Sequence, residues 1–340
     1  MPSGVAAPYG EKMFKYILKR LGISLLILFG VSFLLYALLR AMPTDFIENK
    51  IIALTQSGGT VSDELIQTMY KSYGLDGTPV EGYFRWLGNI FKLDFGKSFI
   101  NRRDVLTEIF DPDKLGVSFT VAAIATVFEF LVAIPLGVTA ATHQYSIRDY
   151  VVTILVLVGI SLPSFFFGQL LKNIFSIKLK WFPISGISSG KTYDSSIQEF
   201  ADRFQHMVLP ICTVVILSIG SRMRMTRTNM LEVLNSDYIR TARAKGLKEN
   251  KVIYKHAFRN TLIPLVTSLA GLIPSLFSGA MITEQVFDLP GMGKFALNAM
   301  TQVDIPVIMT YNMFLAALSV LGVLLADLMY AVVDPRVKLA

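Results

Sequence analysis

The chain of 340 residues is 53% apolar and 17% charged, and its mean hydropathy is +0.52. Ordinary soluble domains contain about 25% charged residues, so this composition excludes that class and indicates a protein that spans a lipid bilayer. The formal net charge of +7 reflects 32 basic and 25 acidic residues, and the positions of the basic residues along the chain predict its orientation in the membrane.

Six apolar runs are long enough to cross a bilayer, whose hydrocarbon core of about 30 Å needs about 20 residues of α-helix. We therefore predict an all-α membrane protein with six transmembrane helices. The runs cover residues 21–41, 117–141, 150–173, 207–226, 263–284 and 306–332.

The first run follows residues 1–20, which contain Lys12, Lys15, Lys19 and Arg20. A basic segment before an apolar one is typical of a secretion signal. This run is longer than a signal core, however, and Arg40-Ala-Met-Pro43 lacks the small-residue cleavage pattern. We therefore expect residues 21–41 to be a retained transmembrane helix.

Residues 42–115 separate the first two runs and carry mixed charge with the turn signals Ser57-Gly-Gly59 and Gly74–Pro79. We expect this segment to fold as a small external subdomain. Apolar residues at helical spacing between Tyr83 and Phe91 form a stripe. The stripe either packs within the subdomain or lies against the membrane or a partner protein in the membrane.

The second and third runs contain candidates for lining a polar pathway through the membrane. Glu129 lies mid-way along the second run, and ionisable groups inside a membrane are costly. It either faces a pathway or makes a structural hydrogen bond to a neighbouring helix. In the third run Pro163 frees backbone groups that need polar neighbours or water, which suits either a cavity wall or a packing kink. The candidate pathway residues are Glu129, Ser161, Pro163, Ser164 and Gln169.

The fourth and fifth runs enclose a basic insert, residues 222–262. From Arg222 to Arg259 it carries ten Lys or Arg residues and three acids. Short cytoplasmic segments carry an excess of Lys and Arg, and six spans place both chain ends on one side. With both ends inside, the cytoplasmic parts hold seventeen basic residues and six acids. We therefore predict that the insert and both ends of the chain are cytoplasmic.

A short helix is predicted inside the insert. Ser236 or Asp237 is a helix start signal, and Gly246 is a stop signal. The topology of the chain explains the basic charge of the insert, but it does not explain a capped helix. The segment of interest consists of Asp237, Tyr238, Ile239, Arg240, Thr241, Ala242, Arg243, Ala244, Lys245 and Gly246.

The helix has a small apolar face. Tyr238, Ala242 and Gly246 recur at intervals of four residues beside Ile239, while the basic side chains spread over the rest of the surface. This face suits docking on another protein.

The sixth run carries one ionisable residue, Asp327, near its cytoplasmic end. Arg222 and Arg224 lie at the cytoplasmic end of the fourth run. Because an unpaired charge in the membrane is costly, we expect Asp327 to form a structural ion pair with one of these two arginines.

The sequence offers no constellation for catalysis, since an intramembrane enzyme would need convergent catalytic groups. Cys212 is the only cysteine and the three histidines are scattered, so we expect no metal cluster. The stretch Ser185–Thr192 resembles a P-loop, but Ser185 replaces its first glycine and no clear strand precedes it. We therefore expect no cofactor on this chain and no enzyme activity of its own.

Several motifs together resemble one family. Tyr238-Ile-Arg-Thr-Ala-Arg-Ala-Lys-Gly246, followed by Arg259-Asn-Thr-Leu-Ile-Pro264, is similar to the cytoplasmic loop of bacterial ABC importer permeases. The general importer pattern begins Glu-Ala-Ala, whereas this chain has Arg240 and Thr241 in the first two places and a longer spacing to Pro264. Both departures are typical of the dipeptide, oligopeptide and nickel permease family. Further similar segments are Gly74-Leu-Asp76, Trp86, Thr283-Glu-Gln-Val-Phe-Asp-Leu-Pro-Gly-Met-Gly293 and Asp327-Leu-Met-Tyr-Ala-Val-Val-Asp-Pro-Arg336.

The resemblance implies the type I importer transmembrane fold over residues 116–333, with a coupling loop at 222–262 and a cytoplasmic tail at 334–340. It implies a prokaryotic plasma membrane, a homologous permease partner, two ABC ATPase subunits that bind ATP and Mg²⁺, and an external substrate-binding protein. The helix from Asp237 would couple the ATPases to transport of short peptides. Nickel complexes or oligosaccharides are alternative cargoes, and an ion-coupled carrier, which often shows repeated halves and needs no ATPase, is the alternative mechanism.

Overall fold

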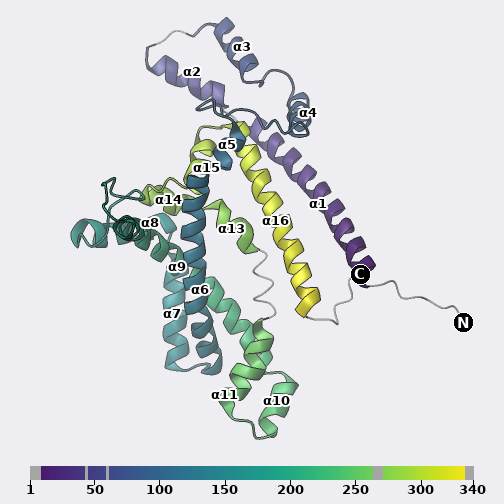
Figure 1. The fold of residues 1–340 in the computed structure, drawn as a ribbon, viewed down its shortest axis with the longest axis vertical. Helices are drawn as coiled ribbons and strands as arrows, with labels where there is room; N and C mark the ends of the chain where they lie inside the picture. Colours follow the sequence, from purple (N-terminus) through teal and green to yellow (C-terminus); the bar gives the residue numbers. More distant parts are fainter. Residues whose placement is uncertain (1–8, 43–44, 59–60, 263–270, 334–340) are drawn as a thin grey trace, which may run out of the picture. The chain divides into compact units, whose positions relative to one another are not determined.

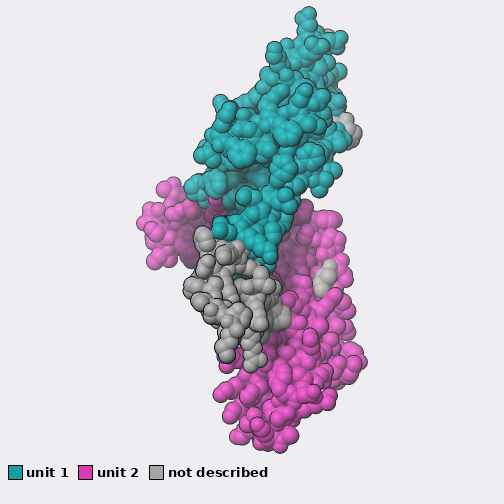
Figure 2. All heavy atoms as spheres, turned by 90° about the vertical axis from the view of Figure 1, so that its right-hand side faces the viewer, with its two compact units in different colours: residues 1–112, 295–340 teal, residues 113–294 magenta. Residues whose placement is uncertain are grey.

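The computed structural model describes residues 9–42, 45–58, 61–262 and 271–333. In these residues the regular secondary structure is helical, with one isolated β-bridge between Lys97 and Asp104 and no strand. The predicted all-α class is therefore confirmed for the part of the chain that the structure describes (Figure 1). The chain divides into two compact units, residues 1–112 with 295–340 (unit 1) and residues 113–294 (unit 2), which are coloured separately in Figure 2.

In its described residues, unit 1 combines two long helices with four short ones and most of α15 (Met292–Thr301). The long helices α1 and α16 pack along each other, and α4 packs on α1. The helices of this unit are α1 (Tyr9–Arg40), α2 (Phe46–Gln56), α3 (Asp63–Ser72), α4 (Pro79–Ile90), α5 (Val105–Ile109) and α16 (Ile305–Val333).

Aromatic packing holds α4 against α1. Tyr83 on α4 is 1% exposed, and its ring meets those of Phe33 and Tyr36 on α1 edge to face, at 5.2 and 5.8 Å between centroids. Such contacts add to the hydrophobic stabilisation from burying the rings. The stripe predicted around Tyr83 thus packs partly inside unit 1, whereas Phe84 and Phe91 are exposed.

Local sequence sets the start of α2 and of α4. Asp45 and Thr78 are the N-caps, and each accepts a hydrogen bond from the backbone N–H of a glutamate three residues later. That glutamate, Glu48 or Glu81, accepts in return from the backbone N–H of the cap. The reciprocal bonds satisfy N–H groups that a helix start leaves without partners.

Unit 2 is built around two long helices, α6 and α9. Their buried residues Val121 and Ile211 belong to one hydrophobic cluster, and Phe287 from α14 joins it. The helices of this unit are α6 (Pro112–Thr142), α7 (Ile147–Ser161), α8 (Ser164–Leu171), α9 (Ser196–Leu234), α10 (Asp237–Ala244), α11 (Glu249–Lys251), α13 (Leu272–Ser278), α14 (Met281–Phe287) and the start of α15 (Met292–Thr301), with π-helical turns η1 (Lys172–Lys178) and η2 (Val252–Ala257).

The third predicted run is not one continuous helix. It is divided between α7 and α8, and Leu162, the residue between Ser161 and Pro163, has extended backbone with φ −85° and ψ 129°. The ring of a proline clashes with the residue before it when that residue is helical. The break predicted at Pro163 is therefore confirmed, and the prediction of a single helix over residues 150–173 is wrong.

Four helical stretches in the described residues are long and apolar enough to span a membrane, namely Leu18–Arg40, Val105–Thr142, Ser196–Leu234 and Ile305–Asp327. They correspond to the first, second, fourth and sixth predicted runs. Of the fifth run, residues 263–270 lie outside the described residues, and the remainder forms α13 and the start of α14 with a turn at Gly279. Six spans, the side of the membrane on which each end lies and an external subdomain stay predictions.

Candidate functional site

The helix predicted in the basic insert is α10, and it begins and ends where the sequence indicates. Ser236 is the N-cap, and its hydroxyl donates to the Val233 carbonyl at 2.6 Å. The helix ends at Ala244, and Gly246 follows with φ +74°, a left-handed conformation that glycine adopts without a steric penalty. The short helix is therefore confirmed between its predicted ends, although the Ser236 side chain makes no capping hydrogen bond to it, and the role of the helix stays a prediction.

One face of α10 is buried against its own chain. Ile239 is 0% exposed and Ala242 is 9% exposed. They belong to a hydrophobic cluster, here called the α10 cluster, that draws residues from the ends of α6 and α9 and from η2. Its buried members are Val138, Ala141, Met230, Leu234, Ile239, Ala242, Val252 and Ala257.

The α10 cluster corrects one prediction. Of the apolar face predicted to dock on another protein, Ile239 and Ala242 instead anchor α10 to unit 2, whereas Tyr238 and Gly246 are exposed. Helical periodicity identifies an apolar face but not the surface that covers it. Packing within the same chain and docking on another protein both bury apolar residues, so the sequence pattern is the same in the two cases.

The opposite face of α10 is exposed and mixed in chemistry. Tyr238 is 48% exposed, and Arg240, Thr241, Ala244 and Lys245 are also exposed. The Asn260 amide donates to the Tyr238 hydroxyl at 3.1 Å and orients that ring. The surface that α10 offers to a partner is therefore this exposed face.

An ion pair braces the turn that follows α10. The Arg243 guanidinium donates to Glu249 at 2.7 and 3.3 Å. These hydrogen bonds raise the pKa of Arg243 and lower the pKa of Glu249. Because both side chains are about half exposed, solvent screens the pair, and its main effect is to orient the turn.

Glu129 is buried and paired. It is 7% exposed, and Arg222 on α9 donates from Nε to its Oε1 at 3.0 Å. The Arg222 guanidinium also lies 4.7 Å from the centroid of the Phe130 ring. This ion pair joins α6 to α9. Of the two alternatives for Glu129, the geometry therefore supports a structural hydrogen bond to a neighbouring helix rather than a side chain that faces a pathway.

Asp327 forms an ion pair as predicted, but the predicted partners, Arg222 and Arg224, are wrong. Asp327 lies 3.2 Å from Arg20 on α1, while Arg222 is paired with Glu129 and Arg224 is exposed. The arginines on α9 and Arg20 both fall near the predicted cytoplasmic ends of their runs, so depth in the membrane could not distinguish them. The helix packing of α1 on α16 decides the pairing.

The remaining candidate pathway residues lie at the break between α7 and α8. Ser161 and Gln169 are exposed, Pro163 is the exposed N-cap of α8, and Ser164 is half-buried. The Ser161 hydroxyl donates to the Leu157 carbonyl at 2.7 Å. No hydrogen bond joins any of these four residues to Glu129 in the described part of the chain, so the structure does not bring the five candidates together.

Sequence reasoning missed a second buried glutamate, Glu284 on α14, which is 1% exposed. The Ser118 hydroxyl donates to its Oε1 at 2.7 Å, and the backbone N–H groups of Ala280 and Lys294 donate to the carboxylate at 3.2 and 2.8 Å. Ser118 in turn accepts from the backbone N–H of Met292 at 2.8 Å.

Glycines make room for this carboxylate. A Cβ atom placed on Gly291 would lie 2.5 Å from Glu284 Oε2, and one on Gly293 would lie 2.7 Å from the backbone nitrogen of Met281. The signal was available in the segment Thr283–Gly293, where a glutamate precedes two closely spaced glycines. It was overlooked because Glu284 stands at the boundary of a predicted span.

The fold and this site together define a class of membrane protein. The chain is an all-α, multi-pass membrane protein whose basic loop carries a short helix, fixed on one side and open on the other. Residues 133–339 match the family described as "Binding-protein-dependent transport system inner membrane component", and residues 13–122 match "Binding-prot-dependent transport system membrane comp, N-term". The chain belongs to this family of transport-system membrane components and is a multi-pass protein of the plasma membrane.

Full-length relatives agree with this assignment. The chain is 36% identical over 326 residues to the oligopeptide transport system permease protein AppB of Bacillus subtilis (strain 168), covering 96% of this chain and 100% of AppB. It is 34% identical over 328 residues to the dipeptide transport system permease protein DppB of the same organism, covering 96% and 99%. A solved structure titled "Inward facing conformations of the MetNI methionine ABC transporter" aligns with 65% of this chain and 94% of its own, at 15% identity and a TM-score of 0.48.

Proposed function

We propose that this chain is the permease subunit of an ATP-driven ABC importer. With a homologous permease subunit it would form the path for short peptides delivered by an external binding protein. Two ABC ATPase subunits, which bind ATP and Mg²⁺, would supply the energy, and the chain itself would hold no cofactor. Two relatives named as oligopeptide and dipeptide permeases, each matched almost end to end, support the cargo class.

The attachment of α10 is the observation that carries the mechanism. Its buried face is fixed to α6, α9 and η2 through the α10 cluster, and close-packed side chains transmit displacement without yielding. A push on the exposed face by a closing ATPase would therefore move the adjoining ends of α6 and α9 together. In this scheme α10 is the coupling helix, and its contact residues are those of the exposed face.

Two ion pairs extend this rigid connection. Arg222 on α9 holds Glu129 on α6, and Arg227 on α9 holds Asp149 on α7 with two hydrogen bonds of 3.0 and 2.9 Å. Both pairs tie a neighbouring helix to α9, the helix that leads into α10. We propose that Glu129 acts in this connection, and that Ser161, Pro163, Ser164 and Gln169 line the pathway at the break between α7 and α8.

The test changes the exposed face of α10 without touching its core. Ala244→Glu places a carboxylate on this face, and Ala201→Glu makes the same change at an exposed position near the start of α9. Each variant would be co-expressed with its permease and ATPase partners, and the purified assembly would be placed in proteoliposomes. We expect Ala244→Glu to lower ATP-dependent peptide uptake at least tenfold and to weaken ATPase recovery, with Ala201→Glu close to wild type.

The same assay separates the alternatives. Uptake that requires ATP and persists after ion gradients are collapsed excludes an ion-coupled carrier. Competition by short peptides, nickel complexes and oligosaccharides identifies the cargo class. Wild-type uptake and ATPase recovery in Ala244→Glu would contradict the role of α10, and the absence of any ATPase from the mildly solubilised complex would contradict the importer itself.

A further inference from the structure

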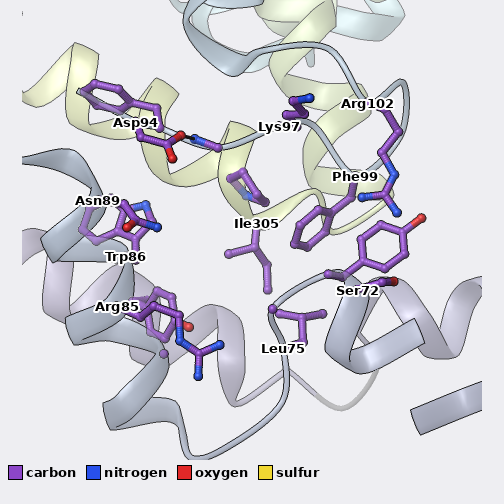
Figure 3. A pocket seen from close by; sticks show the side chains of 17 residues that line it. Ser72, Leu75, Arg85, Trp86, Asn89, Asp94, Lys97, Phe99, Arg102 and Ile305 are labelled. Carbon is purple, nitrogen blue, oxygen red and sulfur yellow. Dashed lines mark hydrogen bonds between the residues drawn. The ribbon is translucent and has the colours of Figure 1, made fainter. Parts of the chain in front are cut away.

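A cavity of about 320 Å³ lies within unit 1, and its lining includes no residue of α10 or of the ion pairs described above (Figure 3). Leu75, Phe99 and Ile305 form its apolar floor, and each is at most 6% exposed. In Figure 3, Ile305 lies near the centre, with Arg85 and Trp86 of α4 on one side and Phe99 and Arg102 on the other. This volume is at the lower end of the range for small-molecule sites, about 300 to 1,000 Å³.

The wall of the cavity formed by residues 98–102 is held rigidly. Asp304, which is 0% exposed, accepts hydrogen bonds from the Ser98 hydroxyl at 2.6 Å and from the backbone N–H groups of Phe99 and Ile100 at 3.0 and 3.3 Å. The backbone N–H of Arg102 donates to the Ser98 carbonyl at 3.1 Å. The wall is therefore fixed by a buried carboxylate from outside the loop, which reduces the ordering needed for a ligand to bind.

Arg102 is held in an unfavourable backbone conformation. Its φ is +62°, a left-handed conformation that is strained for a residue other than glycine. The conformation brings the guanidinium to 3.8 Å from the centroid of the Tyr73 ring. The ring face fixes the plane of the guanidinium and leaves its N–H edge available, which is the geometry that binds a carboxylate with two hydrogen bonds.

The charges at the rim favour an anion. The Arg85 guanidinium forms an ion pair with the Asp76 carboxylate at 3.1 Å. The Asp94 carboxylate accepts a hydrogen bond from the backbone N–H of Gly96 at 2.9 Å. Within the described part of the chain, neither Lys97 nor Arg102 makes an ion pair with a carboxylate. The two positive charges of Lys97 and Arg102 outnumber the single negative charge of Asp94. The rim therefore carries a net positive charge over an apolar floor.

We propose that this cavity is a binding site for a small apolar carboxylate, such as the C-terminal residue of a short peptide. Arg102 binds the carboxylate with its N–H edge, Lys97 adds a second positive charge, and the apolar side chain rests on Phe99, Leu75 and Ile305. The residues that line the site all belong to unit 1, and none of them belongs to α10 or to the ion pairs of α9. The site therefore goes beyond the proposed importer function and does not rest on it.

Trp86 lines the cavity and provides a reporter. The chain contains two tryptophans, so Trp181→Phe leaves Trp86 as the only one. The full-length Trp181→Phe protein in lipid nanodiscs would be titrated with N-acetyl-leucine, and with N-acetyl-leucinamide as the uncharged match. We expect a saturable change in Trp86 fluorescence with the acid, and at least tenfold weaker binding of the amide.

Substitutions at the rim then assign the anion-binding groups. We expect Arg102→Gln to weaken binding of the acid at least tenfold, Lys97→Gln about threefold, and Arg102→Lys by an intermediate amount because it keeps the charge but loses the planar fork. Lys92→Gln removes the same charge from an exposed residue outside the cavity lining and should change binding less than twofold. The thermal midpoint of each variant would confirm that it is folded.

Three results would overturn the proposal. The first is equal binding of the acid and the amide. The second is the absence of acid binding both in fluorescence and in calorimetry on the same protein. The third is a Trp86 response to a purified external binding protein but not to the acid, which would make the cavity a protein-docking surface. None of these results would bear on uptake or ATPase recovery, so failure here is distinct from failure of the importer function.

Discussion

Two regions of unit 2 bury a glutamate to a similar degree and stabilise it in different ways. Glu129 is 7% exposed and faces the guanidinium of Arg222. Glu284 is 1% exposed and accepts from the Ser118 hydroxyl and from backbone N–H groups. Among the described residues no Lys or Arg side chain pairs with Glu284, since the Lys294 ammonium is paired with Asp288.

The difference determines whether a second substitution can restore the stability that is lost when the glutamate is replaced. In a buried ion pair, deleting one partner leaves the other uncompensated, whereas replacing both with apolar side chains is often neutral. The Glu284 carboxylate is surrounded by hydrogen-bond donors, here called the Glu284 cage: the Ser118 hydroxyl and the backbone N–H groups of Ala280 and Lys294. The two backbone donors remain whatever the side chains are. The Glu129 region should therefore be rescued by a second substitution, and the Glu284 region should not.

The largest expected effect is that of Glu284→Ala. It leaves the N–H groups of Ala280 and Lys294 and the Ser118 hydroxyl without their acceptor, and each unsatisfied buried donor costs about 1 to 3 kcal/mol. We expect a loss of about 4 kcal/mol or more in the free energy of unfolding, measured by circular dichroism across an SDS titration. Glu199→Ala, at a half-exposed glutamate paired with the half-exposed Arg203, should change it by less than about 1 kcal/mol.

The next effect sharpens the comparison through a double substitution. Glu129→Leu alone should cost about 3 kcal/mol because it removes the carboxylate that the partly buried Arg222 guanidinium pairs with. Adding Arg222→Met should restore more than half of the loss in the same titration. The matched pair at the other region, Glu284→Leu with Ser118→Ala, should show no rescue. Equal rescue at both regions would refute the distinction between them.

A smaller effect is expected from crowding the Glu284 cage while keeping its donors. Gly293→Ala would place a Cβ 2.7 Å from the Met281 nitrogen and 2.9 Å from Glu284 Oε2, and overpacking of this kind costs about 1 to 3 kcal/mol. Gly88→Ala, on α4 with open space around the new methyl group, should be neutral or stabilising. A neutral result for Gly293→Ala, read from the thermal midpoint, would show that the cage relaxes easily.

The smallest effect concerns pH and a third buried acid. Hydrogen bonds from Arg227 hold the pKa of Asp149 below its usual range, with further bonds from Tyr145 N–H and the Thr153 hydroxyl. A carboxyl whose folded pKa is lowered stabilises the fold above its unfolded pKa of about 3.9 and loses this contribution as pH falls through the folded value. The difference in thermal midpoint between wild type and Asp149→Asn should thus stay constant from about pH 8 to 5.5 and shrink below about pH 4. A difference that changes with pH between 8 and 5.5 would contradict the assignment.

Much of the molecule could be predicted where the signal is local. The end of α10 follows from Gly246 and the break of the third run follows from Pro163, because glycine's left-handed backbone and proline sterics act within a few residues. The partner of Asp327 and the anchoring of Ile239 could not be predicted in this way. Each depends on which helix lies beside another, and residues far apart in sequence at equal membrane depth give the same pattern.

The sequence by itself determined that this chain spans a membrane, that a short helix stands in its basic loop and that it resembles the importer permeases, since composition, periodicity and motif spacing are properties of the chain. Only the tertiary structure decided which face of α10 is exposed, that Arg20 rather than Arg222 or Arg224 pairs with Asp327, and that the backbone encloses Glu284. Those outcomes depend on packing between helices and on the positions of N–H groups in space, which no residue type in the sequence specifies.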